Sequence, residues 1–126
     1  MQELTKLSWP AVEELTTDTA IFPLGAIEAH GKHLPLGTDN YIAQTLAKKL
    51  AAELDSILLP GLPFGQVWSL KNFPGSLSLS TETVSSVIED LAVSLADQGI
   101  KLLVIVNGHF GNNRALKQAA RRVRAE

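Results

Sequence analysis

Two short apolar runs constrain the fold of this chain more than any other feature. Residues 20–24 (AIFPL) and 101–106 (KLLVIV) are almost free of polar side chains, and each is followed at once by a glycine-containing turn. An apolar run of this length between turn residues is typical of a buried strand. The sequence therefore predicts two strands in the interior, each ending in a polar loop.

Helical patterns separate these strands. Apolar side chains at helical spacing predict helices at residues 40–54 and 80–95, and a third short strand is predicted at residues 57–59. A last helix is predicted at residues 113–124, whose basic end suits the negative pole of the helix dipole. Thr38 or Asp39 is the expected cap of the first helix, and Gly99 is expected to end the second. The alternation predicts an α/β fold with three layers (αβα) and a mostly parallel central sheet, joined by right-handed crossovers.

Composition limits the classes of function. The chain has 126 residues, 45% of them hydrophobic, which is enough for one modest core, so we expect a single domain over residues 1–126. A net charge of -2 argues against binding of nucleic acid or an anionic membrane. Residues 1–10 lack a signal-peptide core, and no run reaches the ~18 apolar residues of a membrane span. A cytoplasmic location is expected.

Side chains that can bind metal gather directly after the first strand, in residues 28–39 (EAHGKHLPLGTD). Glu28 and His30 are two residues apart, so they project to the same side of an extended segment. Two glycines and a proline lie between them and Asp39, and these residues allow the loop to return. The segment is therefore predicted to converge on one point.

A second polar turn, residues 107–113 (NGHFGNN), follows the second strand. Ligand sites in open α/β sheets lie outside the carboxyl ends of parallel strands, so His109 is expected beside the Glu28 loop if the two strands are neighbours. The chain has no cysteine, and a metal must be held by nitrogen and oxygen. Two imidazoles and two carboxylates suit zinc, manganese or iron(II). The pattern favours metal-dependent hydrolysis.

These motifs resemble the creatininase family of metal-dependent amidohydrolases. The resemblance extends from about residue 22 to residue 113 and rests on residues 28–31 (EAHG), 33–35 (HLP), 38–39 (TD) and 107–112 (NGHFGN). It implies that Glu28, His30, Asp39 and His109 are metal ligands, with Asp39 as the bridge between two ions. It further implies one or two divalent ions per chain, zinc first and manganese or iron as alternatives. A small-molecule amide substrate and a homo-oligomer, a hexamer in the family, are implied as well.

Three departures from the family pattern stand out. Gly111 occupies the position at which creatininase proper has a further glutamate ligand, so creatinine is a poor guess for the substrate. Ser69 and Leu70 lie where many relatives have a histidine. Family members are about twice as long, within the usual size of one domain, and carry an acid/base glutamate in their C-terminal half. We therefore expect a fold that is truncated relative to the family, with its catalytic acid/base residue unknown.

Further site residues are expected around the metal. His33, Trp68, Phe73, Asn107 and Asn112 are predicted to contact substrate or to support the ligands. Residues 72–79 (NFPGSLSL) also resemble a family segment near the mouth of the site.

Three functions stay open. The first is a metal-dependent hydrolase of a carbon–nitrogen bond, in an amide or cyclic amide, that uses metal-activated water. The second is a catalytically incompetent metal-binding fragment that needs a C-terminal half. The third is a nucleotide- or phosphate-binding α/β module, although the chain has neither a dinucleotide fingerprint nor a phosphate-loop lysine.

Overall fold

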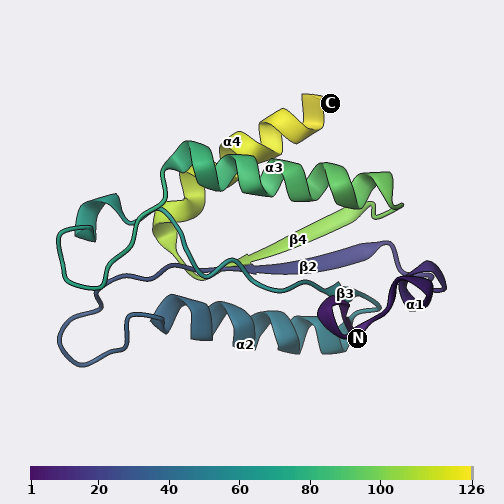
Figure 1. The fold of residues 1–126 in the computed structure, drawn as a ribbon, viewed down its shortest axis with the longest axis horizontal. Helices are drawn as coiled ribbons and strands as arrows, with labels where there is room; N and C mark the ends of the chain where they lie inside the picture. Colours follow the sequence, from purple (N-terminus) through teal and green to yellow (C-terminus); the bar gives the residue numbers. More distant parts are fainter. Residues whose placement is uncertain (126) are drawn as a thin grey trace.

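A parallel sheet lies at the centre of the computed structural model, which describes residues 1–125 (Figure 1). Its four strands follow one another across the sheet in the order β1 (Gln2–Glu3), β3 (Ile57–Leu58), β2 (Thr19–Leu24) and β4 (Leu102–Asn107). Every pairing between them is parallel. The predicted α/β fold with a parallel sheet is confirmed, including the three strands expected from the sequence.

Strands β2 and β4 pair along their whole length. The register runs from Thr19 opposite Leu102 to Leu24 opposite Asn107. One further hydrogen bond follows the last pair, since the Gly108 N–H donates to the Leu24 carbonyl at 2.8 Å. The loops after the two strands therefore begin side by side at one edge of the sheet.

Helices cover both faces of the sheet (Figure 1). Helix α2 (Thr38–Glu53) lies on one face, and α3 (Thr81–Asp97) and α4 (Asn113–Ala125) lie on the other. The remaining elements are short: α1 (Trp9–Glu13) and the 3-10 turns η1 (Leu4–Lys6), η2 (Trp68–Leu70) and η3 (Phe110–Asn112). Neither β1 nor α1 was predicted, because two and five residues are too few to show a periodicity. None of the helices in residues 1–125 combines the length and the apolar character that crossing a membrane requires.

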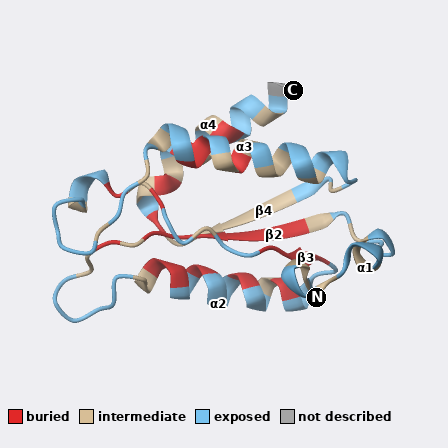
Figure 2. Ribbon diagram, viewed as in Figure 1, coloured by how far each residue is buried: buried red, intermediate tan, exposed pale blue. Residues whose placement is uncertain are grey.

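The two faces of β2 belong to two separate core clusters. Ile21 packs with α2, whereas its neighbours Ala20 and Phe22 pack toward α3 and α4. On α2, the buried face is a row of alanines at a spacing of four residues (Ala43, Ala47 and Ala51), and small side chains there let the helix lie close to the sheet. Figure 2 shows β2 and the inner side of α2 as buried.

The prediction that Thr38 or Asp39 caps α2 is wrong. Gly37 is the N-cap residue, so no side chain of the N-cap accepts a hydrogen bond from the first turn of the helix. The Thr38 hydroxyl donates instead to the Pro35 carbonyl at 2.6 Å, and the Asp39 carboxylate faces two histidines. The predicted helix at residues 80–95 and its end before Gly99 are confirmed, since Gly99 follows α3 with φ +89°. Ser80 caps this helix by accepting from the Thr83 N–H.

The core assignment predicts the effect of truncating Ile21. This side chain is 0% exposed, so we expect Ile21→Ala to lower the free energy of unfolding by about 2–5 kcal/mol. Leu102→Ala is the matched control on β4, since Leu102 is 53% exposed, and it should change stability by about 0.5 kcal/mol or less. Urea denaturation followed by circular dichroism measures both. Equal losses in the two variants would contradict this packing.

Candidate metal site

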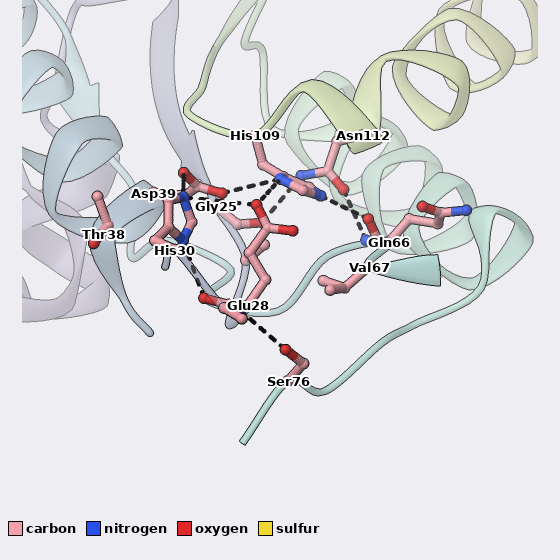
Figure 3. Close-up of polar contacts among 12 residues, drawn as sticks. Gly25, Glu28, His30, Thr38, Asp39, Gln66, Val67, Ser76, His109 and Asn112 are labelled. Carbon is pink, nitrogen blue, oxygen red and sulfur yellow. Dashed lines mark hydrogen bonds and ion pairs between the residues drawn. The ribbon is translucent and has the colours of Figure 1, made fainter. Parts of the chain in front are cut away.

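Three buried side chains from two loops and the start of a helix meet at the carboxyl edge of the sheet (Figure 3). Glu28 lies in the loop after β2, Asp39 in the first turn of α2, and His109 in the turn after β4. Each offers one potential ligand atom, and these atoms lie within 4.8 Å of one another. The sequence expectation that His109 would lie beside the Glu28 loop matches the structure, because β2 and β4 are neighbours.

Two backbone N–H groups hold the loop that carries Glu28 in place. The Glu28 N–H donates to the Leu36 carbonyl at 3.1 Å, and the Ala29 N–H donates to the Ser76 hydroxyl at 3.0 Å. Gly31 adopts φ +69°, a conformation that favours glycine and turns the chain back toward Asp39. The loop is thus held on both sides of the carboxylate.

The proton of His109 is directed away from the carboxylates. Its Nε2 lies 2.6 Å from the Gln66 carbonyl oxygen, which can only accept a hydrogen bond. Nε2 therefore carries the proton, and in the neutral ring Nδ1 has a free lone pair. This Nδ1 lies 2.9 Å from Asp39 Oδ2 and 3.1 Å from Glu28 Oε1. Three electron-pair donors face one another.

His30 is held in the same way and lies beside this group. Its Nδ1 donates to the Glu28 carbonyl at 3.0 Å, and its Nε2 lies 3.0 Å from Asp39 Oδ1 and 3.7 Å from Glu28 Oε1. The hydrogen bond to that carbonyl is the main reason that the pKa of His30 is raised, and the nearby Asp39 carboxylate adds to the effect. Asp39 thus presents one oxygen to each histidine.

Within residues 1–125, these carboxylates form no ion pair with a lysine or an arginine. Asp39 Oδ2 is buried and has no hydrogen-bond partner in this part of the chain, although His109 Nδ1 is close. Burial raises the pKa of Glu28, and the neighbouring Asp39 carboxylate raises it further, while His109 opposes this rise. Two buried carboxylates with an unpartnered oxygen and two imidazole lone pairs fit a divalent cation. The residues therefore suit the metal that the sequence predicts.

The other predicted site residues fall into two groups. Asn107 and Asn112 support the turn that carries His109: the Asn107 side chain donates to the His109 carbonyl at 2.8 Å, and Asn112 is fully buried. His33, Trp68 and Phe73 are exposed. Lys71 lies over the Trp68 ring, with 3.1 Å between its Nζ and the ring centroid. A role of these three in binding substrate stays a prediction.

Sequence reasoning missed Gln66, Ser76 and Asn40. Gln66 acts through its backbone carbonyl, so the identity of its side chain carries no signal. Ser76 lies within a segment noted for its resemblance, but nothing marked its hydroxyl. The Asn40 side chain is buried and donates to the carbonyls of Ala26 and Pro63 at 3.0 Å each, which ties two loops together.

Gly111 is required by the position of its neighbours. A Cβ at this residue would lie 2.5 Å from His109 Nε2 and 2.6 Å from the Gln66 carbonyl oxygen. The glycine therefore makes room for the hydrogen bond that orients His109. A glutamate could not be introduced here without moving that contact.

We expect Gly111→Ala to lower the free energy of unfolding by about 1–3 kcal/mol, because the added methyl group displaces the His109–Gln66 contact. Gly37→Ala is the control, since the nearest heavy atom there is 3.6 Å away and φ is -88°. This control replaces a glycine N-cap and should cost less than Gly111→Ala, about 0.5 kcal/mol. Urea denaturation compares the two variants, and equal stability of Gly111→Ala and Gly37→Ala would refute the steric argument.

Comparisons with known proteins show the family of this chain. A family model, Creatininase: Creatinine amidohydrolase, matches residues 5–126. Creatinine amidohydrolase from Pseudomonas putida is 32% identical over 98 residues, which are 74% of this chain and 38% of that protein. Mycofactocin precursor peptide peptidase from Mycobacterium tuberculosis is 34% identical over 121 residues, 88% of this chain and 48% of that protein. The chain thus spans about half the length, or less, of these relatives.

Solved creatininase structures share the fold of this chain. A manganese creatininase superposes with a TM-score of 0.86, and a mutant creatininase of Zn-Zn type with 0.85. Both are 27% identical in sequence to this chain. Each comparison covers 98% of this chain and 52% of the solved one.

Proposed function

This chain belongs to the creatininase family, and from that premise we propose that it provides the metal site of a metal-dependent hydrolase of a carbon–nitrogen bond. The observation that carries the proposal is the approach of His109 Nδ1 to the Glu28 and Asp39 carboxylates, with its proton directed to Gln66. This arrangement leaves lone pairs that a cation would satisfy.

Glu28, Asp39 and His109 would hold the first ion. His30 would bind a second ion together with Asp39, whose two oxygens face different histidines. Zinc is the first expectation and manganese or iron the alternatives, and the manganese and Zn-Zn creatininase structures support this choice. A divalent ion here would polarise an amide carbonyl and lower the pKa of a water molecule to about 7.

Groups of the protein would set the charge of the site and the orientation of its two imidazoles. Glu28 and Asp39 supply two negative charges that balance a divalent ion, and the backbone carbonyls of Glu28 and Gln66 orient the two imidazoles. With Gly111 in place of a carboxylate, a second ion would have fewer protein ligands. We therefore favour an amide or cyclic amide other than creatinine as the substrate.

Several further features belong to the same proposal. His33, Trp68 and Phe73 would contact a small-molecule substrate, and Asn107 and Asn112 would support the ligands. The protein would act in the cytoplasm, as expected from its sequence, and as a homo-oligomer, as the family resemblance implies. The acid/base residue remains unassigned.

The metal assignment predicts the behaviour of three histidine variants. The purified protein should contain stoichiometric zinc, manganese or iron by elemental analysis. His109→Ala and His30→Ala should each lower zinc affinity more than the roughly 10- to 100-fold cost of losing an outer partner. His33→Ala is the matched control, because His33 is exposed, and it should retain the affinity. Unchanged zinc binding in His109→Ala would refute the site.

A second candidate is a metal-binding chain that is inactive alone. The chain's coverage of 38% and 48% of two curated relatives favours this alternative. The zinc-loaded protein is assayed for release of amine from linear and cyclic amides, with and without the C-terminal half of a family member. Activity of the 126-residue chain alone supports the complete hydrolase. If the chain binds metal but is active only after the C-terminal half is added, the result supports the metal-binding chain that is inactive alone.

A further inference from the structure

The peptide group between Gln66 and Val67 contacts a candidate metal ligand directly. Its carbonyl oxygen accepts from His109 Nε2 at 2.6 Å. Its N–H, that of Val67, donates to the Ser78 hydroxyl at 2.8 Å. Because a peptide group is planar and its N–H and C=O point in opposite directions, the contact with Ser78 fixes where the carbonyl points.

Asn112 holds the preceding peptide group. Its Oδ1 accepts from the Gln66 N–H at 3.0 Å, and its Nδ2 donates to the Gly25 carbonyl at 3.0 Å and to Asn107 Oδ1 at 3.3 Å. Asn112 is 0% exposed, so these partners have no ready replacement. Figure 3 shows that Asn112 and His109 both reach toward Gln66. The loops after β2 and β4 are thereby joined to residue 66.

We propose that Ser78 and Asn112 are positioning residues that select the tautomer of His109. By holding the backbone on both sides of Gln66, they aim its carbonyl at Nε2 and leave the Nδ1 lone pair toward Glu28 and Asp39. This inference rests on the proposed metal site, since only a ligand role makes the choice of nitrogen functional. It also gives residues 72–79 a role, because Ser78 belongs to that segment.

Competition between two acceptors makes this selection necessary. A neutral imidazole carries one proton, and the carboxylates near Nδ1 would attract it more strongly than a carbonyl near Nε2 that is free to move away. A proton on Nδ1 would block the lone pair that a cation needs. A carbonyl fixed at 2.6 Å from Nε2 favours the form that can bind metal. If that carbonyl moves, the proton is expected to move to Nδ1.

The test compares three serine and asparagine variants. Ser78→Ala removes the hydroxyl that holds Val67, and Asn112→Ala removes the amide that holds Gln66. Ser80→Ala is the matched control, because Ser80 also accepts one backbone N–H, that of Thr83 at 3.0 Å, but caps α3 away from His109. All three variants are expected to lose some stability, so stability alone does not distinguish them.

The first measurement is the ¹⁵N chemical shift of the two ring nitrogens of His109 in metal-free protein. Spectra are recorded along a pH titration that reaches the neutral ring. The native protein and Ser80→Ala should show the proton on Nε2. Ser78→Ala and Asn112→Ala should shift toward the form with the proton on Nδ1.

The second measurement is zinc affinity by calorimetry. Asn112→Ala should bind zinc about 10- to 100-fold more weakly, and Ser78→Ala about tenfold more weakly, than Ser80→Ala. Native tautomer and native zinc affinity in a folded Ser78→Ala protein would overturn the proposal, and this exposed residue keeps the test valid even if Asn112→Ala does not fold. Absence of zinc binding in the native protein would refute the metal site, whereas the ¹⁵N spectra test the tautomer choice separately.

Discussion

The parallel pairing of β2 with β4 is the constraint on which the rest of this structure depends. Six residue pairs in register bring Leu24 opposite Asn107, so the two loops that follow start at the same place. Glu28 and His109 are 81 positions apart in the sequence, yet their side chains lie 3.1 Å apart. Helix α2 adds Asp39 from the covering layer, because its row of alanines lets it approach the sheet closely. A shift of this register would separate the ligands.

The chemistry of the site depends on the backbone as much as on the ligands themselves. Each imidazole donates its proton to a carbonyl, His30 to Glu28 and His109 to Gln66, and each then turns its other nitrogen toward a carboxylate. Two acidic side chains that pair with no lysine or arginine of the described chain would repel each other, and a divalent cation would remove that repulsion. Gly111 leaves space for this arrangement, and its lack of a side chain separates this site from one with a further carboxylate. The same backbone contacts thus orient both imidazoles.

Much of the fold could be predicted because the main elements have strong local patterns. The apolar runs at β2 and β4 and the helical spacing in α2, α3 and α4 all appear where the patterns place them. The shortest elements, β1 and α1, were missed because their residues form too short a pattern, and their packing depends on distant parts of the chain. Asp39 was expected to bind metal and was also a candidate cap because of its place before a helix, and its carboxylate contacts His30 and His109 instead of capping α2. Tertiary contacts outweighed the local preference.

The sequence by itself determined the longer helices and strands and which side chains could bind a cation, because hydrophobic periodicity and residue chemistry are local properties. Only the tertiary structure decided that three of these side chains meet and which nitrogen of each histidine faces the carboxylates. It also left no room for a side chain at residue 111. Those outcomes depend on the carbonyl groups of Glu28 and Gln66 and on the buried amide of Asn112. Every residue has a backbone carbonyl, so its use as a hydrogen-bond acceptor leaves no mark in the sequence until the chain has folded.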